Sequence, residues 1–219
     1  MIMHHKEIGM AVDTAKLLLN SFDKSSRLVV NGLDDRYQST MEEFNYAIQQ
    51  KERKCMVLFP SEDAMTFCEL KTKLDQSLEK RGHAQNDKKI DYNDKWDVIV
   101  IDGTWSQARK MYSKYIPKQE DGGPLRVCLS QEAIDMIESS GNAEGDGTIT
   151  GRQLRRHPIK WREISTLEAT RLLIRDVMIQ ENATSSDSSN ACYSILAKYQ
   201  TISDKAAKTQ LGPPRMKQM

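Results

Sequence analysis

The chain has 219 residues, 38% of them hydrophobic, which is enough for one substantial domain with a buried core. Its 32 basic and 31 acidic residues nearly cancel, so the net charge gives no sign of nucleic-acid binding, and an RNA site has to come from local clusters of cations. No apolar stretch is long enough to span a membrane and no secretion signal is visible, so we expect a soluble, intracellular protein of the cytoplasm or nucleus.

Two helices and a short strand are expected in the N-terminal part. Apolar side chains recur at helical spacing from Glu7 to Phe22, which predicts an amphipathic helix. Leu28 to Val30 is expected to form a short strand, and Met41 to Gln49 a second helix after a turn.

The next strand is expected at Cys55 to Phe59, an apolar run. It ends at Pro60, because proline cannot donate a ladder hydrogen bond. Ser61 is the expected N-cap of a helix that runs toward Leu78. The polar segment 81–95 has no periodicity and is interpreted as a surface excursion.

Two further strands are expected at Trp96 to Ile101 and at Leu125 to Leu129, both rich in apolar residues. The residues from Ser106 to Lys114, after the first of these strands, have a helix-forming composition. This alternation of strands and helices predicts an α/β fold with a mostly parallel sheet flanked by helices.

The C-terminal third completes what we expect to be a single domain over residues 1–211. A polar stretch with four glycines, Ser139 to Gly151, is interpreted as a flexible insertion. A long helix begins near Ser165, and helical character returns from Cys192 to Leu211 after a serine-rich linker. Residues 212–219 are expected to form a flexible tail.

The most informative stretch is VIDGTWSQA, residues 100–108. An apolar strand stops at Asp102, and Trp105 follows before the helix begins. Ligands of open α/β sheets bind outside the carboxyl ends of the strands, which is where Asp102 is expected to lie. Thr104 and Gln107 also match a T-x-x-Q capping box, so for this motif alone a structural role is the better interpretation.

The stretch resembles the D-x-T-W signature of the DTW-domain family. Two further segments match that family's other motifs in the expected order, LFPSEDA at Leu58–Ala64 and STLEA at Ser165–Ala169. The resemblance runs from about the His4 region to the C-terminal helix. It departs from the family at His5, which stands where proline is usual in an H-P-x-E segment.

The resemblance implies a fold related to the SPOUT class, with a C-terminal knot. It also implies transfer of the 3-amino-3-carboxypropyl group of S-adenosylmethionine to N3 of a uridine in tRNA, with release of methylthioadenosine. S-adenosylmethionine is then the co-substrate and tRNA the partner. Many members carry a cysteine-rich, zinc-binding segment ahead of the domain, which this chain does not contain, and its four cysteines are scattered. We therefore expect no structural zinc. We also expect no metal requirement, because the sulfonium of the co-substrate is already an activated leaving group.

Two other functions stay open. A SPOUT-like RNA methyltransferase would share the fold and the co-substrate but leave a different product, and a non-catalytic RNA-binding module would transfer nothing. The absence of G-x-G-x-x-G after any strand counts against a Rossmann-type methyltransferase.

The resemblance places the co-substrate in the loops after consecutive strands and at the start of the last long helix. STLE is also an S-x-x-E capping box, so a cap explains Glu168 equally well. The N–H groups at a helix start would nevertheless suit a carboxylate such as that of the methionine end. The residues expected to bind the co-substrate are Phe59, Pro60, Ser61, Ile101, Gly103, Thr104, Trp105, Leu129, Ser165, Thr166, Leu167 and Glu168.

Asp102 is the motif carboxylate that we expect to be catalytic. Uracil N3 carries a proton that must leave as the new bond forms, and an ordinary aspartate is too acidic to remove it easily. Asp102 is therefore either a base made more basic by its surroundings or an electrostatic partner of the sulfonium or the uracil N–H. Trp105 has three readings: a stack on uracil, a cation–π contact with the sulfonium, or a filler of the strand–helix junction.

A run of cations with no acidic residue, GRQLRRHPIKWR, occupies residues 151–162 immediately before STLEA. Guanidinium groups suit phosphate contacts and an aromatic ring can stack on an unpaired base, although plain solvated surface is the alternative. The residues expected to contact RNA, including two on the helix after Trp105, are Arg109, Lys110, Arg152, Arg155, Arg156, Lys160, Trp161 and Arg162.

Overall fold

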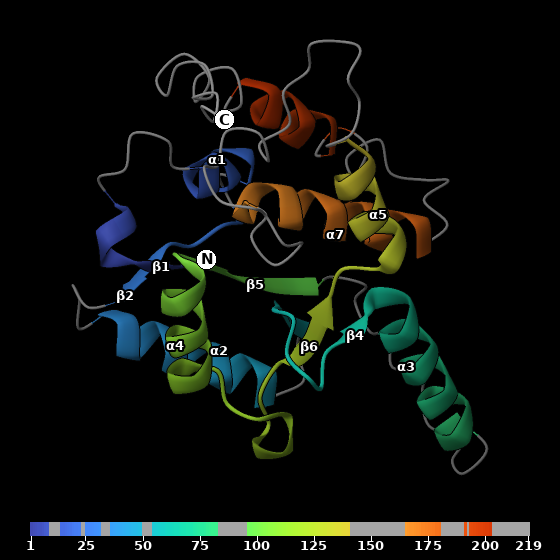
Figure 1. Ribbon diagram of the computed structural model, residues 1–219. Helices are drawn as coiled ribbons and strands as arrows, with labels where there is room; N and C mark the ends of the chain where they lie inside the picture. Colours follow the sequence, from blue (N-terminus) through green and yellow to red (C-terminus); the bar gives the residue numbers. More distant parts are fainter. Residues whose placement is uncertain are drawn as a thin grey trace, which may run out of the picture.

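The computed structural model describes residues 1–8, 14–22, 25–31, 36–49, 54–82, 96–140, 165–180, 191 and 193–202. These residues form an α/β fold around a six-stranded sheet, and every pair of neighbouring strands is parallel (Figure 1). The predicted α/β class with a mostly parallel sheet is confirmed.

The strand order in the sheet is β2-β1-β5-β3-β6-β4, so β5 and β3 lie at its centre. Strands buried on both faces carry near-continuous apolar runs, and β3 and β5 do so. The bounds are β1 Ile2–His4, β2 Val29–Asn31, β3 Lys54–Leu58, β4 Met65–Thr66, β5 Trp96–Asp102 and β6 Leu125–Cys128.

Helices cover both faces of this sheet (Figure 1). The helices α2 and α4 lie on one face, and α1, α3, α5 and α7 on the other, together with a last helical segment at 193–202. Their bounds are α1 Thr14–Ser21, α2 Arg36–Gln49, α3 Phe67–Gly82, α4 Trp105–Tyr115, α5 Gln131–Ser140 and α7 Thr166–Gln180, with short 3₁₀ turns at His5–Glu7 and Gln119–Asp121.

Alternation along β5 divides its side chains between the two layers. Ile99 and Ile101 pack in a cluster with Met111 of α4, whereas Val100 packs with Leu167 of α7. Asp102 follows the same alternation as Val100, so its carboxylate lies on the α7 face of the sheet. The packing of the two layers therefore decides which helix the motif carboxylate meets.

The N-terminal segment differs from the sequence prediction because it contains a strand. β1 inserts between β2 and β5, pairs Met3 with Asp102, and leaves Met3 with no exposed surface. Three residues are too few to show strand periodicity, which is why composition alone did not predict it. The first predicted helix is correct at its C-terminal end, where α1 is described, but His5–Glu7 is a 3₁₀ turn.

The predicted N-cap at Ser61 is wrong. Residues 59–64 form a loop and β4 follows, so α3 begins only at Phe67. The cap is Thr66: Glu69 accepts hydrogen bonds from the Thr66 N–H at 2.8 Å and the Thr66 hydroxyl at 2.9 Å, and the Glu69 N–H donates to Thr66 Oγ1 at 3.3 Å. This is a T-x-x-E capping box, a stronger start signal than serine alone.

Several predictions concern residues outside the described ranges. They include most of the glycine-rich insertion at 139–151, the tail at 212–219, and the path of residues 141–164 on which the expected C-terminal knot depends. Among the described helices, none combines the length and the apolar character needed to cross a bilayer.

Candidate active site

The carboxyl ends of β3, β5 and β6 lie at the same edge of the sheet, because the strands are parallel. Leu58 is in register with Val100 on β5 and with Val127 on β6. Phe59 directly after β3, Asp102 at the end of β5 and Leu129 directly after β6 therefore lie at this edge. Segments far apart in the sequence thus supply neighbouring loops, at the place where parallel sheets bind their ligands.

Asp102 at the end of β5 meets the first residue of α7. The Thr166 hydroxyl donates to Asp102 Oδ1 at 2.6 Å. α7 starts here because Ser165, which is buried, accepts the Glu168 N–H on its hydroxyl at 3.1 Å, as expected for the serine of the capping box. Two of the three sequence motifs therefore join through one short hydrogen bond.

The turn between β5 and α4 is tightly built. Thr104 and Gln107 form the predicted capping box, with the Thr104 N–H donating to Gln107 Oε1 at 2.7 Å and the Gln107 N–H to Thr104 Oγ1 at 3.4 Å. Gly103 has a φ of 157°, and a Cβ there would lie 3.2 Å from Gln107 Oε1 and 3.4 Å from the Cβ of His4. Only glycine lets the strand end, the cap and β1 approach so closely.

The third motif joins through aromatic rings. Phe59, directly after β3, stacks on Trp105 with ring centroids 5.3 Å apart and on Tyr112 with centroids 4.2 Å apart. Trp105 is half-buried and packs against the cluster beneath α4, so it does fill the strand–helix junction. Its other two expected roles, a stack on uracil or a contact with the sulfonium, would have to use the part of the ring that Phe59 does not cover.

A buried arginine holds the loop after β3. Arg126 on β6 is 5% exposed, and its Nε donates to the Tyr112 hydroxyl and lies 3.1 Å from Asp63 Oδ2. Tyr112 in turn donates to Ser61 Oγ at 3.1 Å. Both Ser61 and Asp63 belong to the LFPSEDA segment, so this segment is anchored to α4 and β6 by polar contacts as well as by Phe59.

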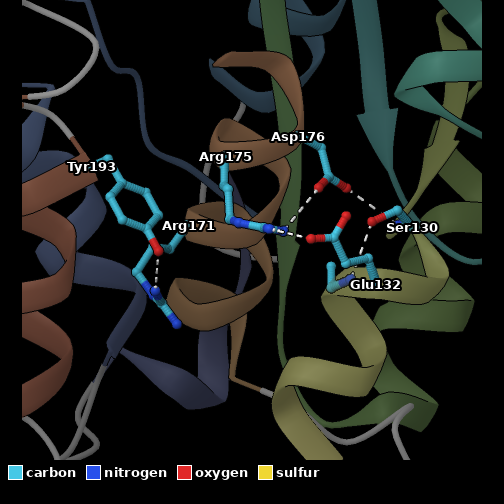
Figure 2. A network of polar contacts seen from close by, with 7 residues as sticks. Ser130, Glu132, Arg171, Arg175, Asp176 and Tyr193 are labelled. Atoms are coloured by element: carbon cyan, nitrogen blue, oxygen red, sulfur yellow. Dashed lines mark hydrogen bonds and ion pairs between the residues drawn. The ribbon is translucent and has the colours of Figure 1, made fainter. Parts of the chain in front are cut away.

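The loop after β6 is held to α7 by a network of ionic contacts (Figure 2). Asp176, which is buried, accepts the Ser130 N–H on Oδ2 at 3.3 Å, and its Oδ1 lies 3.7 Å from Arg175 Nη1. Arg175 also pairs with Glu132 in the first turn of α5. Ser130 itself caps α5, since its hydroxyl accepts the Ala133 N–H at 3.2 Å.

Comparison with known families decides what this arrangement belongs to. The model of the DTW domain matches residues 1–201, which covers nearly the whole chain. The chain belongs to the DTW-domain family. This is the family of the tRNA-uridine aminocarboxypropyltransferases, so tRNA modification is the function class that the match supports. No curated protein and no solved structure matches the chain.

Most co-substrate residues predicted for the DTW domain lie at this one edge, but they present different groups. The side chains of Ile101 and Leu167 are buried in apolar clusters, so only their backbone groups are available at this edge. Leu129 packs against the clusters around Ala133 and Leu173. The polar side chains at the edge are therefore those of Asp102, Thr166 and Ser61, with the side chains of Thr104 and Ser165 in caps.

Two of the residues predicted to contact RNA are described. Arg109 and Lys110 are exposed near the start of α4, and the Arg109 guanidinium carbon lies 5.9 Å from the centre of the Trp105 ring. The others, Arg152, Arg155, Arg156, Lys160, Trp161 and Arg162, lie outside the described residues.

Tyr112, Arg126 and Asp176 were not singled out from the sequence. Tyr112 lies within the stretch predicted as a helix and Arg126 within a predicted strand, and an arginine inside an apolar strand run is a signal of a buried ion pair. No cluster of three or more His, Cys, Asp or Glu side chains able to hold a metal occurs in the described ranges.

Proposed function

We propose that this DTW domain transfers the 3-amino-3-carboxypropyl group of S-adenosylmethionine to N3 of a uridine in tRNA. The observation that carries the proposal is the hydrogen bond between Asp102 and Thr166, which unites the D-x-T-W and STLEA motifs at the carboxyl edge of the parallel sheet. Phe59 adds the third motif through its stack on Trp105.

The residues at this edge suit a sulfonium nucleotide. A carboxylate, two hydroxyls and an aromatic ring, from Asp102, Thr166, Ser61 and Trp105, offer an anion for the cationic sulfur, donors for polar oxygens and an apolar surface. When bound, the sulfonium supplies an activated leaving group, so the protein needs only to place the reacting atoms and control charge.

The Thr166 hydroxyl bears on the two roles left open for Asp102. A hydrogen bond donated to a carboxylate is charge-assisted and favours the ionised form, and the start of α7 favours a negative charge as well. Both effects stabilise the anion. We therefore propose that the Asp102 carboxylate faces the cationic centre and orients the uracil N–H, and that it accepts the N3 proton as the N3–C bond forms and the C–S bond of the sulfonium breaks, with methylthioadenosine leaving.

Transfer assays test this proposal. Purified protein is incubated with unmodified tRNA and S-adenosylmethionine labelled either in the aminocarboxypropyl carbons or in the methyl group. We expect only the first label to enter tRNA, and we expect Asp102→Asn to lose most of this transfer while still binding the co-substrate. Incorporation of the methyl label would instead establish a methyltransferase, and incorporation of neither label a non-catalytic RNA-binding module.

The surface near the edge suits a tRNA substrate. Arg109 and Lys110 place two cations on α4, one turn from Trp105. We propose that they contact the phosphates that flank the target uridine, together with the predicted cationic run at 151–162.

A further inference from the structure

We propose that Arg126 and Tyr112 are positioning residues that aim the Ser61 hydroxyl at the carboxylate of the co-substrate's amino-acid arm. The inference rests on the proposed function and adds the part of the site that would hold this end of the molecule. It is built on a chain of hydrogen bonds that starts at a buried cation and ends in the LFPSEDA loop.

The direction of this chain follows from the donors. A guanidinium can only donate, so Arg126 Nε–H donates to the Tyr112 oxygen. The Tyr112 hydrogen then goes to Ser61 Oγ at 3.1 Å. Ser61 accepts through its oxygen, and within the described part of the chain its hydroxyl donates no hydrogen bond to another side chain. Its hydrogen is therefore available to an acceptor at the sheet edge.

The burial of Arg126 indicates that this arrangement serves more than packing. A buried charge is costly unless it is paired, and a buried ion pair is often no more stable than apolar side chains of the same volume. Here the pairing depends on the loop, because the counter-charge is Asp63, whose side chain is 63% exposed. Arg126 Nη2 donates to the Pro117 carbonyl at 3.0 Å, while Nη1 has no hydrogen-bond partner in the described part of the chain.

Charge complementarity selects the acceptor. A hydrogen-bond chain that begins at a cation polarises its last donor, which then suits an anionic oxygen best. The alternative position for a carboxylate, the start of α7, already faces the Asp102 carboxylate through Thr166. A second anion there would be repelled. The Ser61 side of the edge is therefore the better place for the carboxylate, and the Asp102 side for the cationic groups.

Binding measurements test the inference. Titration calorimetry compares wild type, Tyr112→Phe and Ser61→Ala with S-adenosylmethionine and with methylthioadenosine, which lacks the amino-acid arm. We expect the Kd for S-adenosylmethionine to rise about fivefold in Tyr112→Phe and about tenfold in Ser61→Ala. The Kd for methylthioadenosine should be unchanged. Ser61→Ala with Tyr112→Phe should weaken binding no more than Ser61→Ala alone.

Tyr115→Phe is the matched control. Tyr115 lies on the same helix and its hydroxyl also donates a side-chain hydrogen bond, to Asn31 Oδ1 at 2.7 Å, but it does not reach the loop. Tyr112→Phe and Tyr115→Phe should lower the melting temperature similarly, and only Tyr112→Phe should change the Kd for S-adenosylmethionine. Tyr112→Phe keeps the ring that stacks on Phe59, so the fold should persist.

Three outcomes would overturn the inference: an unchanged Kd for S-adenosylmethionine in Tyr112→Phe and Ser61→Ala, an equal loss of affinity for methylthioadenosine, or fully additive losses in the double variant. Failure of the proposed function looks different. If wild type binds S-adenosylmethionine but transfers no aminocarboxypropyl group, the reaction is wrong while the binding comparison still decides the role of Tyr112. A wild type that binds no S-adenosylmethionine overturns both.

Discussion

Thr166 donates a hydrogen bond to Asp102 from a position 64 residues later in the chain. The contact closes the carboxyl edge of the central strand against the start of α7. It has two consequences: the carboxylate is held in one orientation, and its charge lies at the helix end where a negative charge is favoured. We expect transfer to depend on this bond as well as on Asp102 itself.

Thr166→Val should lower kcat for transfer about tenfold or more, because a hydrogen bond to a charged group is lost and Asp102 is no longer held. Thr166→Ser keeps the hydroxyl and should restore most of the rate. Steady-state kinetics with labelled co-substrate measure both. Equal rates in the valine variant and wild type would show that Thr166 does no more than begin the helix.

Gly103→Ala should destabilise the fold and also impair transfer. Its φ of 157° is strained for any side chain, at a cost of about 1–3 kcal/mol, and the new Cβ would press on Gln107 and His4. Urea denaturation measures the stability cost. Gly122→Ala is the control, because Gly122 has a φ of 80° at the end of a 3₁₀ turn outside the motifs. A comparable stability loss with unchanged transfer is expected there.

The sequence allowed the fold class to be predicted because β3, β5 and β6 are apolar runs that are separated by turn and helix signals. Capping boxes predicted the starts of α4 and α7 because they depend on residues three positions apart. β1 and β4 were missed because they are short and, unlike the predicted strand at Leu28 to Val30, contain no run of consecutive aliphatic residues.

The candidate site divides in the same way. Asp102, Thr166 and Phe59 lie in motifs and could be predicted, although their contacts could not. The roles of Tyr112, Arg126 and Asp176 depend on partners in other elements, and even the local signal of an arginine inside an apolar strand does not identify those partners. Residues that position a site through tertiary contacts become visible only when the layers are assembled.

The Thr66 cap predicts a pH dependence of stability. Hydrogen bonds from the Thr66 N–H and hydroxyl lower the pKa of Glu69 below its usual value. The stabilisation is therefore complete above the unfolded pKa of about 4.3 and is lost as the pH falls through the lower folded pKa. Between about pH 5.5 and about pH 3, wild type should lose more stability than Glu69→Gln. Parallel slopes for the two proteins would exclude a contribution from Glu69.

Arg109 and Lys110 should contribute to tRNA affinity and not to co-substrate affinity. The double variant Arg109→Ala/Lys110→Ala removes two phosphate contacts and should weaken tRNA binding. The slope of log affinity against log salt concentration should become shallower by about two. Filter binding at several salt concentrations measures both. Lys114→Ala, which removes a cation from the last turn of the same helix, is the control and should have the smaller effect. Identical salt slopes in the double variant and wild type would contradict the RNA role.

Asp176 should contribute more to stability than Glu132, the other carboxylate that pairs with Arg175. Asp176 is buried and joins the loop after β6 to α7. Its carboxylate accepts the Ser130 N–H and faces Arg175, so Asp176→Asn removes a buried charge beside a half-buried guanidinium and should cost about 1–3 kcal/mol of unfolding free energy. Glu132→Gln removes the other partner of Arg175, but the Glu132 side chain is 69% exposed, so about 0–1 kcal/mol is expected. Urea denaturation gives the two values.

The same comparison links stability to the site. Leu129 and Ser130 form the loop after β6, which Asp176 ties to α7, and the helix α7 presents Thr166 to Asp102. Loosening this tie should raise the Kd for S-adenosylmethionine in Asp176→Asn by a few-fold, whereas Glu132→Gln should bind as wild type does. If both variants lose the same stability and the same affinity, the network contributes through the general packing of α5 on α7 and not through the loop. A selective loss in Asp176→Asn would show that the pair of Asp176 and Arg175 positions the loop after β6 for binding.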